Sequence, residues 1–68
     1  MTEDQALALA LNHAGLTEEQ VTRLRMEKDI DRGVTLYEID FDHGGYEYEY
    51  EIRTSDGKIL KQELDRDD

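Results

Sequence analysis

The residues best suited to chemistry in this sequence are carboxylates that recur along residues 37–52. On either side of a His-Gly-Gly segment, acidic residues alternate strictly with apolar, mostly aromatic ones. Alternation at every second position is the pattern of a strand with one buried face and one solvated face. Such a field of acids could dock a basic surface, although most charge runs are simply solvated. The six candidate site residues are Glu38, Asp40, Asp42, Glu47, Glu49 and Glu51.

Two short motifs raise the question of calcium. A DxDxG spacing begins at Asp29 and again at Asp40, and Glu51 stands twelfth when counted from Asp40. An EF-hand loop wraps its ligands around one ion between two helices, whereas residues 40–51 are predicted to be strands. The fifth position of the second motif is Gly44, which supplies no side-chain ligand. We therefore predict no specific metal site and no cofactor, and keep a weak Ca²⁺ response only as an alternative.

The remaining reactive side chains do not form a catalytic set. The chain has no Cys, Ser55 lies in a predicted turn, and His13 and His43 fall at a helix end and a hairpin tip. A nucleophile needs an adjacent base, and an open sheet face offers no dry pocket to shift a pKa. We predict no catalytic residues and no enzymatic activity.

The length and the net charge of the chain narrow the class of partner. The chain has 68 residues and a net charge of −10, from 18 acids against 8 bases. We expect residues 1–68 to form one small domain. The negative charge disfavours nucleic acid and anionic membranes and favours a basic protein. No apolar run is long enough to span a bilayer, so we expect a soluble domain without membrane insertion. The oligomeric state is left open.

The elements that must position the acids begin with a helix. Thr2 to Gln5 form a capping box, and Gly15 is placed to end the helix. His13 is expected to be exposed in its last turn, and a second capping box at residues 17–20 predicts one short turn. The spacing of the apolar residues predicts one buried helix face. Its members are Leu7, Ala10, Leu11 and Ala14.

The strands follow. Residues 21–28 are predicted to form the first, with Leu24 and Met26 on one face, before a polar turn over residues 29–33. The central hairpin turns at Gly44-Gly45 or, slipped by one residue, at His43-Gly44. A Gly44-Gly45 turn sets Asp42 against Glu47, Asp40 against Glu49 and Glu38 against Glu51. Either register sets acid against acid, and the flanking bases could offset the repulsion. These bases are Arg23, Arg25, Arg53 and Lys61.

The last hairpin is predicted from the Asp56-Gly57 turn, with Thr54 pairing with Lys58. This register sets Ile52 against Leu60, Tyr48 against Leu64 and Glu51 against Lys61. The predicted fold class is α+β, with one N-terminal helix packed on the aromatic face of a four-stranded antiparallel β-meander. The helix can cover only part of this sheet, so an apolar margin or an edge strand could take a partner by strand addition.

A set of short pieces occurs in a characteristic order, namely Ala6-Leu7, Ala10-Leu11, His13-Ala14-Gly15, Tyr37-Glu38-Ile39, Phe41, Gly45-Tyr46, residues 48–52 and residues 56–60. In order and spacing these pieces resemble the PepSY domain family (peptidase propeptide and YpeB-like domains). This resemblance implies a small bacterial domain of one helix on an antiparallel sheet, found in propeptides of secreted metallopeptidases and in cell-envelope proteins. It further implies a protein partner, a role in restraining peptidase activity, and an extracellular or cell-envelope location.

Overall fold

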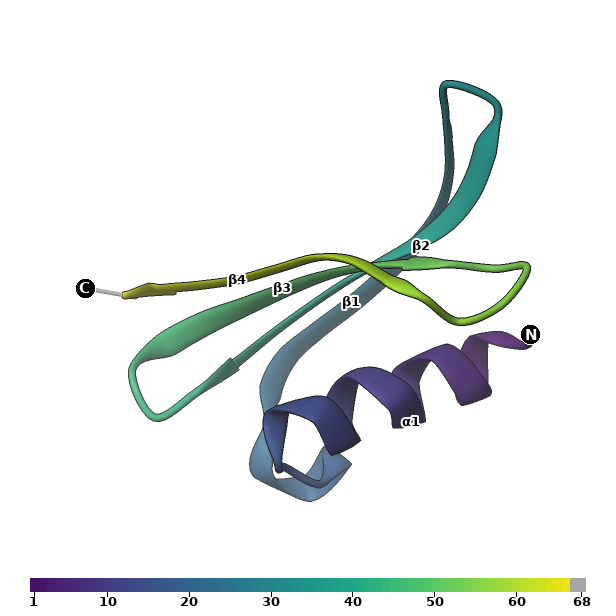
Figure 1. The fold of residues 1–68 in the computed structure, drawn as a ribbon. Coiled ribbons are helices and arrows are strands. Elements are labelled where there is room, and N and C mark those ends of the chain that lie inside the picture. The colour runs from purple at the N-terminus through teal and green to yellow at the C-terminus, as the bar shows by residue number, and fades with distance from the viewer. Residues whose placement is uncertain (67–68) are drawn as a thin grey trace.

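The computed structural model describes residues 1–66 and contains one α-helix, one 3₁₀ turn and four strands. The strands form one antiparallel sheet in the order β1-β2-β3-β4, and α1 lies against one of its faces (Figure 1). This arrangement confirms the predicted α+β fold. The elements are α1 (Glu3–Ala14), η1 (Glu18–Gln20), β1 (Thr22–Asp31), β2 (Val34–His43), β3 (Tyr46–Arg53) and β4 (Ile59–Arg66). Within residues 1–66, neither helix has the length and apolar character needed to cross a membrane.

Both ends of α1 form as predicted. The Thr2 hydroxyl accepts a hydrogen bond from the Gln5 N–H at 3.1 Å, and the Gln5 side chain accepts one from the Thr2 N–H at 2.9 Å. This reciprocal pair satisfies two N–H groups that a helix start would otherwise leave without partners. Gly15 adopts a left-handed conformation with φ of 75° and ends the helix.

The buried face of α1 is centred differently from the prediction. Ala6 and Ala10 are fully buried and Leu11 is nearly so, whereas Leu7 and Ala14 are only partly buried. Ala6 was not in the predicted set. Because alanine has no side chain beyond Cβ, two alanines one turn apart let the helix backbone lie close to the sheet. The larger leucines then pack at the margins of the contact.

The β1–β2 connection is tighter than predicted. β1 continues to Asp31, and the turn consists only of Arg32 and Gly33, which have φ values of 53° and 81°. Positive φ at both positions suits the twist of a two-residue hairpin. The predicted five-residue polar turn over residues 29–33 is therefore wrong.

The first strand also starts irregularly. A β-bulge lies between Thr22 and Arg25, and Arg23 has a φ of 53°. An extra residue disturbs the alternation of a strand. As a result Leu24 is exposed while Met26 packs against the core, so the prediction that they share the covered face fails for Leu24.

The central hairpin has the Gly44-Gly45 register. Both glycines have positive φ, and Asp42 pairs with Glu47, as the first of the two predicted registers requires. The apolar side of this hairpin forms the centre of the core, where the Phe41 ring stacks on Tyr48 and Tyr50 at centroid distances of 5.2 and 6.0 Å. The largest fully buried side chains all come from β2 and β3. They are Ile39, Phe41, Tyr50 and Ile52.

The β3–β4 register is confirmed in part. Tyr48 pairs with Leu64 and Glu51 with Lys61, as predicted, but Ile52 pairs with Ile59 rather than Leu60. A bulge beside this pair leaves Leu60 exposed.

The cause of this shift lies in the connecting loop. The Arg53 N–H donates to the Lys58 carbonyl at 2.9 Å, so residues 54–57 form a four-residue loop and Thr54 does not pair with Lys58. The Asp56 carboxylate holds this wider loop by accepting hydrogen bonds from the Arg53 side chain and from the Lys58 N–H. Thr54 instead donates its N–H to the Thr35 carbonyl at 3.0 Å. Side-chain bonding within the turn therefore overrides the three-residue loop expected from Asp-Gly.

The close approach of α1 to the sheet makes a direct prediction. Replacing Ala10 by Leu should destabilise the fold by about 1–3 kcal/mol, because extra methylenes must force the helix away from a filled core. The exposed neighbour Ala8 provides the matched control, since Ala8→Leu should change the free energy of unfolding by no more than about 0.5 kcal/mol. Urea denaturation followed by circular dichroism measures both. Equal effects of the two changes would contradict the observed helix packing.

Candidate functional site

All six candidate carboxylates lie on the side of the β2–β3 hairpin that faces away from α1. We call these six residues the acid face; they are Glu38, Asp40, Asp42, Glu47, Glu49 and Glu51. The hairpin register sets them against one another in three directly opposed pairs. Strands β1 and β4 extend each pair into a row across the sheet. The rows are Glu27-Glu38-Glu51-Lys61, Arg25-Asp40-Glu49-Glu63 and Thr22-Asp42-Glu47-Asp65.

The acid face is more crowded than a freely solvated surface. All six residues are half-buried, and the Asp42 side chain is only 15% exposed. A shallow, open hollow of about 290 Å³ lies over the middle of the face. Carboxylates line most of it, and Lys61 closes one side. The face is therefore a concave acidic surface and not a scatter of independent charges.

Three of the four predicted counter-charges reach the acid face. Arg23 lies 3.6 Å from Asp42, and Arg25 lies 3.3 Å from Asp40. Lys61 is shared, with its amino group 3.8 Å from both Glu49 and Glu51 and 3.7 Å from Glu63.

The fourth predicted counter-charge, Arg53, is used elsewhere. It pairs with Asp56 in the β3–β4 loop at 2.6 Å, so this part of the prediction is wrong. The sequence offers a signal in retrospect, because Asp56 stands three residues after Arg53 in a tight turn.

Burial, together with neighbouring acids, affects the ionisation of Glu38 and Glu49. Burial raises the pKa of Glu38, and a hydrogen bond to Asp29 together with the nearby charges of Asp29, Glu51 and Glu27 raises it further. Burial likewise raises the pKa of Glu49; Lys61 opposes this shift, while neighbouring acids add to it. A raised pKa means that the folded chain disfavours the charged carboxylate. The fold thus keeps charges that reduce its own stability.

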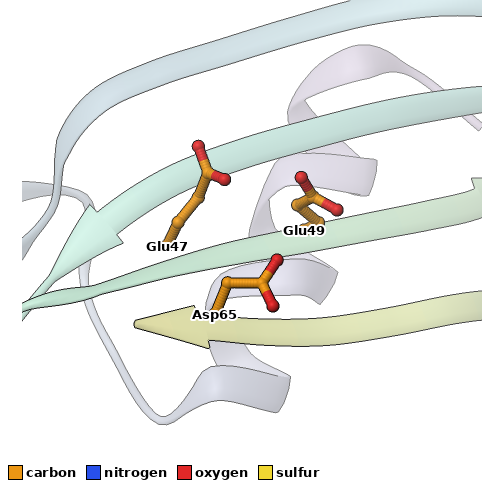
Figure 2. Close-up of side chains that lie close together, drawn as sticks. All are labelled: Glu47, Glu49 and Asp65. Carbon is orange, nitrogen blue, oxygen red and sulfur yellow. The ribbon is translucent and has the colours of Figure 1, made fainter. Parts of the chain in front are cut away.

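A compact group of three carboxylates lies at one end of the acid face (Figure 2). One oxygen from each of Glu47, Glu49 and Asp65 lies within 4.8 Å of the other two. Asp65 was missed at the level of sequence, although the predicted pairing of Tyr48 with Leu64 already set the next residue, Asp65, against Glu47. Ca²⁺ takes about six to eight oxygen ligands, so three side chains would leave most of its coordination to water.

The DxDxG motifs do not close into loops. Residues 40–51 form the β2–β3 hairpin, in which Asp40 pairs with Glu49 and Glu51 pairs with Glu38. In the other motif, Asp29 and Asp31 both lie on β1. Both motifs are therefore by-products of alternating strand sequence.

Both histidines have structural contacts that their positions in the sequence did not predict. His13 is exposed at the end of α1, as expected, but its Nδ1 lies 2.9 Å from the Tyr50 hydroxyl and its ring meets the Tyr50 ring edge-on. His43 Nδ1 donates to the Gln20 carbonyl at 2.8 Å and ties the hairpin tip to η1. Ser55 lies in the β3–β4 loop, apart from both histidines.

Comparison with known proteins now assigns the family. Residues 1–63 match the sequence model of PepSY, described as "Peptidase propeptide and YPEB domain". The chain belongs to the PepSY family. Its helix and four-stranded sheet agree with the fold that the resemblance implied. No solved structure matches the chain.

Two curated relatives are similar over most of this PepSY chain. One is the uncharacterized protein Spy1430 of Streptococcus pyogenes, 34% identical over 62 residues, which cover 91% of this chain and 48% of that protein. The other is the uncharacterized protein YkoJ of Bacillus subtilis, 36% identical over 66 residues, which cover 96% of this chain and 36% of that protein. The chain thus spans half or less of the length of these relatives.

The acid face makes a prediction about stability. Changing Glu47 and Glu49 to Gln should leave the fold intact or raise the free energy of unfolding by about 0.2–1 kcal/mol, because each change removes an opposed like charge. The lost contact of Glu49 with Lys61 is long and partly solvated, so it should offset little of this gain.

The pH dependence has a defined sign. The Glu49 pKa is raised in the folded chain, so the folded state binds this proton more tightly than the unfolded state does. Protonating Glu49 as the pH falls therefore favours folding, and the advantage of the Gln variant should shrink from neutral pH towards acid. Thermal melts between pH 7 and 4 measure this, with exposed Glu19→Gln as the control. A lower melting temperature for the double variant at pH 7 would show that the two carboxylates make stabilising bonds.

Proposed function

We propose that this PepSY domain is a non-enzymatic protein-binding module that restrains a peptidase in the bacterial cell envelope or outside the cell. The acid face is its docking surface. The observation that carries the proposal is the crowding of six carboxylates in three directly opposed pairs, among which burial and neighbouring acids raise the pKa of Glu38 and Glu49. A basic partner would relieve this repulsion on binding, so the charge arrangement that costs stability would contribute to affinity.

The shape and charge of the face support docking of a protein surface. The hollow is shallow and open and is lined mainly by carboxylates, which suits a protruding basic side chain better than an apolar small molecule. Lys61 neutralises the face only in part, because three acids share its single charge.

The remaining side chains favour binding over catalysis. His13 contacts the Tyr50 hydroxyl and His43 donates to the Gln20 carbonyl, while Ser55 lies in the exposed β3–β4 loop. A catalytic nucleophile requires a neighbouring base that is itself oriented. The family description as a peptidase propeptide points to peptidases as the partner class and to an envelope or extracellular location.

An inhibition assay tests the proposed function. Micromolar domain should slow the cleavage of a fluorogenic peptide by at least one secreted bacterial metallopeptidase, and added salt should weaken the effect because exposed charges are screened. A variant with Asp40→Asn, Glu49→Gln and Glu51→Gln should inhibit about tenfold less. The matched control carries Glu18→Gln, Glu19→Gln and Asp31→Asn, three changes outside the acid face. Equal inhibition by the two variants would remove the acid face from the proposal.

A second candidate function is an interaction module with an acidic docking face, no inhibitory role and a weak response to Ca²⁺. The proximity of Glu47, Glu49 and Asp65 favours it, since three carboxylates that already lie together lose little freedom when they bind a cation.

Calcium titration tests this alternative. If the three carboxylates bind Ca²⁺ in the folded state, about 5 mM Ca²⁺ should raise the melting temperature, because a ligand that binds only the folded chain stabilises it. The Asp65→Asn variant should lose that increase, while Asp31→Asn should keep it. A melting temperature that does not change with Ca²⁺ would dismiss the alternative.

A further inference from the structure

The sheet has two open edges, and they differ in the side chains that border them. The strand order places β1 at one edge and β4 at the other. Alternate residues of an edge strand direct their backbone N–H and C=O groups outward, where another chain can pair with them. The bulge at the start of β1 and the left-handed backbone of Arg23 interrupt that edge. β4 has its own bulge beside Ile59, and beyond these irregular starts both edges run regularly, β1 from Arg25 to Asp31 and β4 from Lys61 to Arg66.

The β4 edge also borders apolar surface that α1 does not cover. Leu64 is 49% exposed and Tyr46, on the neighbouring strand β3, is 38% exposed, whereas Tyr50 and Ile52 beneath the helix are fully buried. Both exposed residues lie on the aromatic face, because Leu64 pairs with Tyr48 and Tyr46 is two residues from Tyr48 along β3. In Figure 1 the outer half of β4 and the β2–β3 turn extend beyond the end of α1.

The opposite face at this edge is acidic. Glu63 and Asp65 alternate with Leu64 along β4, and Asp65 lies in the carboxylate group with Glu47 and Glu49 (Figure 2). Lys61 provides the positive charge at the inner end of this stretch. On the aromatic face this stretch of β4 presents Gln62, Leu64 and Arg66, so an added strand would meet Leu64 on one face and carboxylates on the other.

We propose that β4 is a docking edge for an extended segment of a partner protein in which apolar residues alternate with Lys or Arg. The segment adds a fifth strand beside Lys61–Arg66, places an apolar side chain next to Leu64, and sets its cations beside Glu63 and Asp65. This inference rests on the proposed function of protein binding and names the partner segment and its mode of attachment.

Charge complementarity selects this partner over a second copy of the chain. Two β4 strands side by side oppose like charges in the registers that set Glu63 against Glu63 or Asp65 of the second copy, and like charges opposed across a sheet are destabilising. β1 of a second copy offers no better match, because Glu27, Asp29 and Asp31 follow Arg25 on the side that would meet those acids. A partner strand that carries cations at those positions instead forms favourable charge pairs with Glu63 and Asp65.

The test uses synthetic peptides and the intact chain. The probe alternates Val and Lys over eight residues and carries a fluorophore for anisotropy measurements. A peptide of the same composition, with four Val followed by four Lys, keeps the charge but cannot place Val and Lys on opposite faces of a strand. We expect this block peptide to bind the chain at least about tenfold more weakly than the alternating peptide does. Equal binding of the two peptides would overturn the inference in favour of simple attraction to the negative charge.

Backbone pairing is tested separately. Two further probes carry N-methyl groups on every Val or on every Lys, and only one of the two sets of N–H groups can face β4 in an antiparallel pair. One N-methylated probe should therefore lose binding while the other keeps it. Probe binding should also slow amide hydrogen exchange along β4 and leave β1 unchanged. Equal affinity of both N-methylated probes, or protection confined to β1, would overturn the inference.

Two substitutions locate the edge. Glu63→Lys should weaken the alternating peptide about tenfold, and Leu64→Ser about threefold, because they remove a charge contact and an apolar contact. The matched control, Glu27→Lys, makes the same charge change on the acidic side of β1 and should alter affinity by less than about twofold. Equal loss in Glu63→Lys and Glu27→Lys would overturn the inference.

The outcome is separable from that of the proposed function. If the Glu63→Lys chain still inhibits a peptidase like the parent chain, and no alternating peptide binds the parent, the strand-addition inference fails while protein binding by the acid face stands. If the peptide binds as described and no peptidase is inhibited, the docking edge stands and the inhibitory role fails.

Discussion

The structure depends on the register of the β2–β3 hairpin. Side chains alternate between the two faces of a strand, so a slip of one residue would send acids into the core and rings into water. The paired positive-φ glycines at residues 44 and 45 fix that register at the turn, and the burial of Phe41 and Tyr50 under α1 fixes it along the strands. Each constraint requires the same alignment, which is the agreement between local and global preference expected of a well-defined fold.

The same register accounts for the tension on the other face. Once the rings are aligned, the acids must also align, and each pair places two carboxylates opposite one another. The flanking strands lessen the repulsion through Arg25 and Lys61 but do not remove it. Natural sheets often carry edge charges that prevent unwanted pairing. Here the acids continue through the two central strands, where protection of the edges does not require them, and this distribution favours a role in recognition.

Much of the fold could be predicted because its signals are local. The capping box at Thr2, the stop at Gly15 and the glycine turn at residue 44 each depend on a few adjacent residues, and each is confirmed. All six residues of the acid face followed from one pattern, so their common placement was also predictable. Which of them a partner contacts stays a prediction.

The features that escaped prediction depend on contacts distant in sequence or on competing local bonds. The partnership of His13 with Tyr50 joins residues 37 apart in the chain, and no local pattern marks it. The burial of Ala6 depends on the angle at which α1 crosses the sheet. The four-residue loop depends on the preference of Asp56 for Arg53 and Lys58 over the tighter turn. The place of Asp65 could have been derived from the predicted pairing of Leu64.

The bulge at Arg23 has a consequence for crowded conditions. An open sheet with two pairing-competent edges can add molecule to molecule in one direction without limit, since head-to-tail contacts that do not close produce fibres. In this chain the start of β1 is bent by its bulge at Arg23, and the start of β4 has a bulge beside Ile59. Bulges at both edges therefore shorten the flat surface on which one molecule could add to the next, which works against filament growth.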